Sequence, residues 1–181
     1  IFILPYPIFS PHLQKTEHKI MKGKITRILM VCLGNICRSP LAEGILKHRL
    51  DEERIFNVEV DSCGFEAYHL NDPPDKRSVE VALKHGVDIR NQRQRLFKYE
   101  DFSLFDKIYV MDSNNFSDVA SMAQRNSDLN NVDFLSNLIY PGQNKAIPDP
   151  YYGGKEGFEN VYRMIDECCD ELVKKIKLHQ F

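Results

Sequence analysis

The chain lacks several features that would assign it to a large functional class. Its five cysteines are an odd number, and they form no C-x-x-C pair and no cysteine/histidine cluster. This argues against structural zinc and against a secreted disulfide framework. There is also no G-x-G-x-x-G motif and no lysine after a glycine-rich loop, the usual signs of nucleotide binding. We expect a protein that needs no metal or other cofactor and that resides in the reducing cytoplasm.

An excess of positive charge is missing too. The 24 Lys and Arg residues against 26 Asp and Glu residues give a net charge of −2, which argues against binding to nucleic acid or to an anionic membrane. Residues 1–24 carry three prolines between Pro5 and Pro11, and no basic segment precedes their apolar part. Neither a signal peptide nor a membrane span fits this pattern. We expect residues 1–23 to form an N-terminal extension outside the fold, with a regulatory or docking arm as the alternative.

What is present suits one α/β domain over residues 24–181. The 181 residues, 43% hydrophobic and 28% charged, can form a real core. Strand-like runs at 25–33, 57–63, 106–111 and 132–135 alternate with helix-like segments at 39–50, 75–85, 113–125 and 158–176. Ser39 is expected to cap the first helix, with Pro40 at its first position, and Gly86 to end the second. The alternation predicts a doubly wound parallel sheet in a single domain.

The segment VCLGNICRSP, residues 31–40, lies where the first strand turns into the first helix. Ligands bind at the carboxyl ends of parallel strands, and a loop entering a helix can aim several N–H groups at one anion. Arg38, separated from Cys32 by five residues, adds a planar fork suited to phosphate oxygens. These positive groups favour the Cys32 thiolate, Gly34 and Asn35 tolerate a left-handed backbone, and the Ser39 hydroxyl can stabilise the sulfur. The arrangement suits attack on phosphorus.

A thiolate of this kind needs a general acid to expel an alkoxide or aryloxide. The segment IPDPYYGG, residues 147–154, holds Asp149 between two prolines and places Tyr151 and Tyr152 directly after it. In isolation, a proline-rich turn ahead of the last helix is the simpler interpretation. Beside the phosphate-binding loop, a catalytic acid is favoured.

Together, VCLGNICRSP and DPYYG resemble the phosphate loop and the acid loop of the low-molecular-weight protein tyrosine phosphatases. The resemblance covers roughly residues 24–177 and includes Asp61-Ser62, Pro73-Pro74-Asp75 and Lys84-His85-Gly86. It implies a four-stranded parallel sheet with helices on both faces, and hydrolysis of phosphotyrosine through a cysteinyl-phosphate. It also implies phosphotyrosine-containing proteins as substrates and inorganic phosphate or vanadate as inhibitory anions.

By position, the resemblance makes Cys32 the nucleophile, Arg38 the phosphate-binding residue and Asp149 the general acid and base. The phosphate-binding loop and its support then consist of Leu33, Gly34, Asn35, Ile36, Cys37, Ser39, Ser62 and His85. The walls of the substrate pocket are expected to be Tyr68, Tyr151 and Tyr152, with Tyr68 standing where many members have tryptophan. Cys37 is implied as the partner of Cys32 in a reversible disulfide.

Three other functions use similar residues. Arsenate reductases need further cysteines downstream, but none occurs between Cys63 and Cys168. Arginine phosphatases favour threonine where this chain has Ile36, and a catalytically dead phosphotyrosine-binding module is disfavoured because the nucleophile, the arginine and the acid are all present. Among the remaining residues, Cys63, Cys168 and Cys169 are expected in the core. Asp112 could either support the site or cap the following helix.

Overall fold

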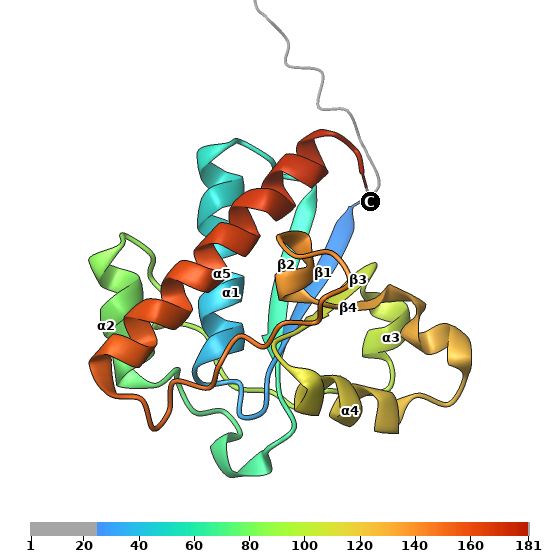
Figure 1. Ribbon diagram of the computed structural model, residues 1–181, viewed down its shortest axis with the longest axis horizontal. Helices are drawn as coiled ribbons and strands as arrows, with labels where there is room; N and C mark the ends of the chain where they lie inside the picture. The colour runs from blue at the N-terminus through green and yellow to red at the C-terminus, as the bar shows by residue number, and fades with distance from the viewer. Residues whose placement is uncertain (1–24, 181) are drawn as a thin grey trace, which may run out of the picture.

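A parallel sheet lies at the centre of the structure, a computed structural model that describes residues 25–180 (Figure 1). Its strands are β1 (Thr26–Val31), β2 (Val58–Cys63), β3 (Lys107–Val110) and β4 (Val132–Phe134). They lie in the order β2-β1-β3-β4, and every pairing between them is parallel. The predicted fold class is confirmed. The expected extension, residues 1–23, lies outside the described residues, so its boundary stays a prediction.

Strand β1 is an inner strand of the sheet and leads into the loop that carries Cys32, and its apolar sequence suits an inner position. Residues 28–31 are fully buried, as expected for an apolar run that is covered on both faces of a sheet. Ile28 and Met30 point into one hydrophobic core, while Leu29 and Val31 point into the other, because successive side chains of a strand alternate between faces.

Helices cover both faces of the sheet. The first core is closed by α1 (Arg38–Glu52), α2 (Lys76–Lys84) and α5 (Gly154–Lys177), and α5 packs along α1 (Figure 1). The second core is closed by α3 (Asp101–Leu104) and α4 (Ser113–Met122). Three short 3₁₀ segments complete the described chain: η1 (Ala67–His69), η2 (Asn126–Asn131) and η3 (Leu135–Leu138). None of the helices in this part of the chain is long and apolar enough to span a bilayer.

The predicted helix boundaries need one correction of substance. Helix α1 begins at Arg38 with Cys37 at the N-cap position, and Ser39 is not the cap. The Ser39 hydroxyl instead contacts the side chains of Cys32 and Asn35. The expected stop of α2 is confirmed, since Gly86 follows the helix with φ 81°, a left-handed conformation that glycine adopts without strain.

The order of the strands fixes where a ligand can bind. The chain moves from β1 to β2 on one side and later returns to β3 on the other side of β1. The loop after β1 therefore lies at the point where the strand order reverses, at the lower end of the molecule in Figure 1. In open parallel sheets this is the usual place for a binding crevice.

Candidate active site

The loop between β1 and α1 is held from outside through its carbonyl groups. The Leu33 carbonyl accepts hydrogen bonds from the amides of Phe65 (2.7 Å) and Glu66 (3.2 Å), and the Ile36 carbonyl accepts one from Asp75 (2.8 Å). Among the described residues, no hydrogen-bond acceptor is found for the backbone amides of residues 33–37. Several N–H groups are thus left to bind one anion where α1 begins.

Asn35 fixes the shape of this loop. Its backbone is left-handed, with φ 50°, as predicted; Gly34, for which the same was expected, has no positive φ. The Asn35 side-chain amide donates to the hydroxyls of Ser39 (2.9 Å) and Ser62 (2.8 Å). A Cβ atom added to Gly64 would lie 2.5 Å from the Leu33 carbonyl oxygen, so only glycine fits behind the loop.

Cys32 lies at the base of the loop and is 2% exposed. Its sulfur is 3.1 Å from the Ser39 hydroxyl, a distance at which either atom can donate. Behind the loop, the Ser62 hydroxyl donates to the buried Glu43 carboxylate (2.6 Å), and Lys47 donates to the other oxygen of that carboxylate (2.6 Å). A chain of hydrogen bonds therefore runs from Cys32 through α1 to a partly exposed ammonium group.

Arg38 is almost fully buried and carries three contacts on its terminal nitrogens. One nitrogen donates to the Asp112 carboxylate and to the Ile147 carbonyl (3.1 Å), and the other donates to Asp149 (3.2 Å). The buried Nε atom of Arg38 has no partner among the described residues and is available to an incoming oxygen. Burial alone would lower the pKa of Arg38, but Cys32, Asp112 and Asp149 raise it above its ordinary value, which keeps the guanidinium charged.

Asp112 performs both of the functions considered for it. One carboxylate oxygen accepts from Arg38, and the other accepts from the Asn115 amide at the start of α4 (2.8 Å). The cap fixes the carboxylate on α4, and the carboxylate in turn orients the guanidinium.

Asp149 reaches the pocket from a loop far along the chain. The Ile147 amide donates to the Met111 carbonyl (2.8 Å), which fastens this loop to the end of β3. Asp149 itself accepts from Arg38 through one oxygen and from the Tyr151 amide through the other (3.0 Å). Its side chain is 44% exposed, so it can meet both a substrate and water.

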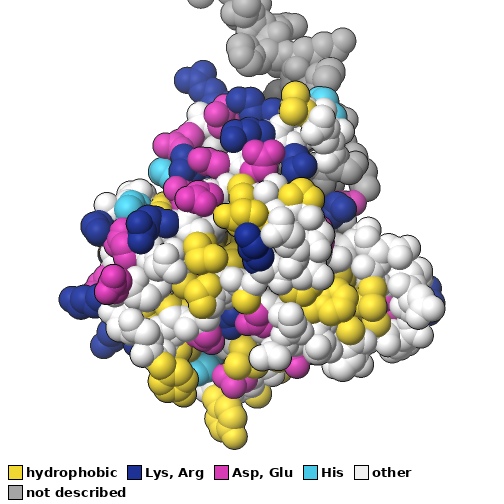
Figure 2. Space-filling model, in the orientation of Figure 1, with side chains coloured by type: hydrophobic (Ala, Val, Ile, Leu, Met, Phe, Trp, Pro, Cys, Tyr) yellow, Lys and Arg dark blue, Asp and Glu magenta, His cyan; other side chains and the backbone are white. Residues whose placement is uncertain are grey.

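These residues surround one cavity of about 260 Å³. Its lining consists of Cys32, Leu33, Gly34, Ile36, Cys37, Arg38, Glu66, His69, Asp149, Tyr151 and Tyr152. The structure therefore brings most of the predicted site residues to one cavity, and Asn35, Ser39 and Ser62 lie buried behind it. At the same end of the molecule, Figure 2 shows apolar side chains beside acidic and histidine side chains.

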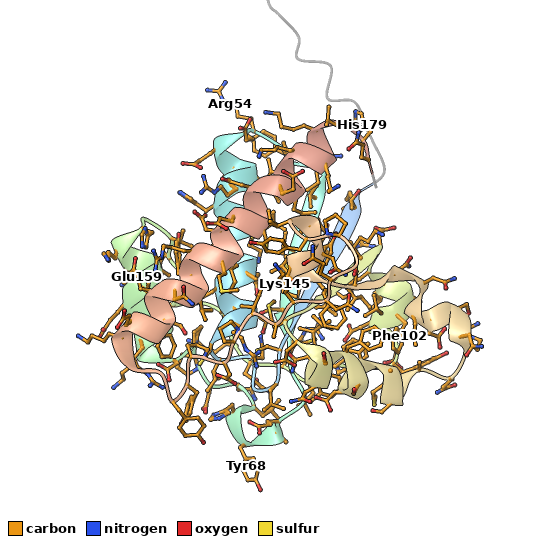
Figure 3. The ribbon with its side chains drawn as sticks, viewed as in Figure 1. Arg54, Tyr68, Phe102, Lys145, Glu159 and His179 are labelled. Carbon is orange, nitrogen blue, oxygen red and sulfur yellow. The ribbon has the colours of Figure 1, made fainter. Side chains whose placement is uncertain are left out.

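Tyr68 does not line the cavity, and the prediction that it forms a wall is wrong. Its side chain is 93% exposed and projects away from the molecule in Figure 3. Tyr68 lies in η1, where three residues complete a turn and neighbours point in different directions. The wall is instead formed by Glu66 and His69, which local sequence signals did not single out.

His85 does not support the phosphate-binding loop. It caps the end of α2, contacts the Glu159 carboxylate at 2.9 Å and stacks on Tyr162 at 4.2 Å. Figure 3 places Glu159 away from the Tyr68 end of the molecule. The Asn35 oxygen instead accepts from the backbone amide of Arg95 (3.1 Å). A backbone donor leaves no mark in the sequence, although Glu43, one helical turn after Ser39, could have been found by its spacing.

The other four cysteines are buried as well. Cys37 lies against the cavity, but burial raises the pKa of its thiol to about 12, with Asp75 and Cys32 adding to the effect. Burial likewise raises the pKa of Cys63, Cys168 and Cys169, and all three lie in the cores as expected.

The chain matches known proteins over most of its length. The sequence model of the family described as "Low molecular weight phosphotyrosine protein phosphatase" matches residues 27–180. The protein of that name from Schizosaccharomyces pombe is 35% identical over 156 residues, which cover 84% of this chain and 98% of the relative.

Solved structures agree with the sequence match. A protein tyrosine phosphatase from Entamoeba histolytica superposes with a TM-score of 0.79 at 29% identity, covering 86% of this chain and 99% of the other. The Drosophila arginine phosphatase superposes with a TM-score of 0.76 at 32% identity, covering 83% and 97% of the two chains.

Proposed function

The chain belongs to the low molecular weight phosphotyrosine protein phosphatase family, and on this basis we propose that it hydrolyses phosphotyrosine through a cysteinyl-phosphate. One observation carries the proposal: Arg38 binds Asp149 in the cavity that Cys32 lines, so a nucleophile, a fixed cation and a carboxyl group share one small space.

The phosphate group would bind over the Cys32 sulfur. The amides of residues 33–37 and the Arg38 Nε atom supply donors for its oxygens. A phosphate dianion competes with Asp149 for the Arg38 guanidinium, and binding therefore frees the carboxyl group to face the leaving oxygen. Tyr151 and Tyr152 offer aromatic surface to the phenol ring.

In the first step the Cys32 thiolate attacks phosphorus, a sulfur–phosphorus bond forms, and the bond from phosphorus to the phenolic oxygen breaks. Asp149 gives its proton to that oxygen, so tyrosine leaves as a neutral phenol. The positive Arg38 side chain stabilises the charge on the equatorial oxygens of the transition state.

In the second step Asp149, now ionised, accepts a proton from water while the water oxygen attacks phosphorus. The sulfur–phosphorus bond breaks, phosphate is released and Cys32 leaves as a thiolate. The Ser39 hydroxyl, 3.1 Å from the sulfur, donates to that thiolate and makes it a better leaving group. The cycle then restarts with both groups in their initial states.

The nucleophile is tested by Cys32→Ser on a phosphotyrosine peptide. This variant is expected to lose turnover while it still binds vanadate, because Arg38 and the loop amides stay in place. Wild type should release phosphate from phosphotyrosine peptides and from neither phosphoserine peptides nor phosphoarginine. Undiminished turnover by Cys32→Ser, or equal turnover of phosphoserine, would contradict the proposal.

The general acid is tested by Asp149→Ala. On phosphotyrosine kcat/KM should fall by about 10²- to 10⁴-fold, the usual contribution of a positioned acid. The loss should shrink on aryl phosphates whose leaving group is already a stable anion, since little proton donation is then required. A loss independent of the leaving group would assign Asp149 another role.

We also propose that the enzyme works in the cytoplasm and that Cys37 protects Cys32 from irreversible oxidation. All five cysteines are free thiols in the structure, in keeping with a reducing compartment. Cys37 lines the same cavity as Cys32, where it can react with an oxidised nucleophile.

A further inference from the structure

Arg77, in the first turn of α2, reaches across to the loop that follows Asp149. Its guanidinium donates to the Tyr151 carbonyl oxygen (2.8 Å). In Figure 1 the start of α2 lies beside the segment that leads into α5. In the described chain, this is the one side-chain hydrogen bond from another segment to residues 150–153.

The contact acts on the residue that holds the general acid. Tyr151 donates its amide to one oxygen of Asp149 (3.0 Å), while its carbonyl accepts from Arg77. Both backbone groups of Tyr151 are therefore used, one toward Asp149 and one toward α2. Movement of the Tyr151 backbone would carry the Asp149 carboxylate with it.

Arg77 is itself held from two sides. It donates to both oxygens of Asp75, at 3.0 and 2.8 Å, and its guanidinium lies over the rings of Phe158 (4.5 Å) and Tyr151 (5.1 Å). Phe158 is 1% exposed, so it offers a fixed surface. A guanidinium with a bidentate ion pair and aromatic contacts has little freedom left.

Asp75 connects this group to the other half of the site. Its amide donates to the Ile36 carbonyl of the phosphate-binding loop (2.8 Å). A continuous series of contacts therefore joins the loop that carries the nucleophile to the loop that carries the acid. The Arg77 hydrogen bond keeps the pKa of Asp75 below its ordinary value of 3.8, so the ion pair persists in the mildly acidic range where a general acid works.

We propose that Arg77 is a positioning residue that sets the Asp149 carboxyl group against the leaving oxygen. The inference rests on the proposed function, because it assigns Arg77 no contact with substrate and an effect only through Asp149. Its loss should thus weaken proton donation and leave anion binding unchanged.

The chain offers a matched control at Asp88 and Arg90. There too an aspartate accepts from the amide and the guanidinium of the arginine two residues later, at 3.0, 2.9 and 2.7 Å. Within the described residues, the Arg90 guanidinium has hydrogen bonds to Asp88 and none to the acid loop or the phosphate-binding loop. Arg90→Ala therefore removes a similar ion pair without touching either loop.

The experiment measures kcat/KM on a phosphotyrosine peptide and on an aryl phosphate with a more acidic phenol. In Arg77→Ala, kcat/KM on the peptide should fall by about 10- to 100-fold, the scale expected when a catalytic group is displaced. On the aryl phosphate with the more acidic phenol, kcat/KM should fall by less than about 3-fold. Arg77→Lys, which keeps the charge but loses the fork, should fall between wild type and Arg77→Ala. Vanadate affinity should stay within about 2-fold of wild type in both variants, and Arg90→Ala should match wild type throughout.

A double variant separates positioning from general damage. If Arg77 acts through Asp149, adding Arg77→Ala to Asp149→Ala should cost no further activity on the peptide. An equal loss on both substrates, weaker vanadate binding, or additive losses in the double variant would overturn the inference. An inactive wild type would instead reject the proposed function, so the two failures are distinguishable.

Discussion

The two cysteines of the phosphate-binding loop are both buried, at 2% exposed for Cys32 and 5% for Cys37. Burial raises the pKa of the Cys37 thiol to about 12. When peroxide oxidises Cys32 to a sulfenic acid, the Cys37 thiolate must attack that sulfur and displace hydroxide, which leaves as water. Very little of Cys37 is thiolate at neutral pH.

Closure of the Cys32–Cys37 disulfide should therefore accelerate as pH rises from 6 to 9, since the thiolate fraction grows about tenfold per unit below the pKa. The rate is measured by a peroxide pulse, quenching with an alkylating reagent, and mass spectrometry. Cys37→Ser should recover less activity with dithiothreitol, while Cys168→Ser, another buried thiol, should recover like wild type. A closure rate that does not depend on pH would contradict this account.

For single residues, the sequence predicted which side chains carry reactive groups in the site, but it did not predict which way each side chain points. Cys32 and Arg38 are close in sequence, and Asp149 stands in a motif of its own, so their joint presence at one cavity was foreseeable. Tyr68 was misplaced because the direction of a side chain within a 3₁₀ turn depends on how the turn packs. The support of Asn35 by Arg95 was invisible because a backbone amide provides it.

Helix α1 supports the site through Glu43, which is 5% exposed and accepts from Ser62 and Lys47. Glu43→Ala should lower the free energy of unfolding by about 1–3 kcal/mol, because it leaves a buried hydroxyl without its acceptor. Urea unfolding measures the change. Glu52→Ala removes an exposed carboxylate near His48 and Arg49 of the same helix and should stay within about 0.5 kcal/mol of wild type. Equal effects of the two substitutions would deny Glu43 its buried role.

Elements with a strong periodic pattern were predictable, and short ones were not. Strand β1 was predicted from its apolar run, and its predicted ends are within two residues of those in the structure. Helix α5 was predicted from the helical spacing of its apolar residues. By contrast, α3 and η1 span four and three residues, too few to show a period. The start of α1 was shifted because the Ser39 hydroxyl, which suits a cap, is used by Cys32 and Asn35 instead.

At the scale of the whole molecule, several buried thiol and phenol groups have raised pKa values. Burial raises the pKa of Cys37 and Cys168 from 9.0 to about 12, and that of Tyr162 from 10.0 to about 12. Burial also raises the pKa of Cys63 and of Cys169. Above pH 9 the unfolded chain releases protons that the folded chain keeps, so the stability present below pH 9 is lost as pH rises.

The free energy of unfolding should accordingly fall between pH 9 and pH 10.5, with a slope of about 1.4 kcal/mol per pH unit for each fully released proton. Urea titrations at pH 7.5, 9, 10 and 10.5 measure it, and Cys168→Ser should flatten the slope. Constant stability across this range would show that the thiols ionise freely in the folded state.

The position of β1 also has a consequence for biosynthesis. Its neighbours β2 and β3 both come later in the chain, Thr26 pairing with Val58 and Ile28 with Lys107, and parallel strands cannot form by a local hairpin. The loop with Asp149 follows later still, and the core closes only with α5. A ribosome therefore translates Cys32 early and Asp149 late, and a fragment released before Asp149 would lack both this carboxyl group and the helix that closes the core.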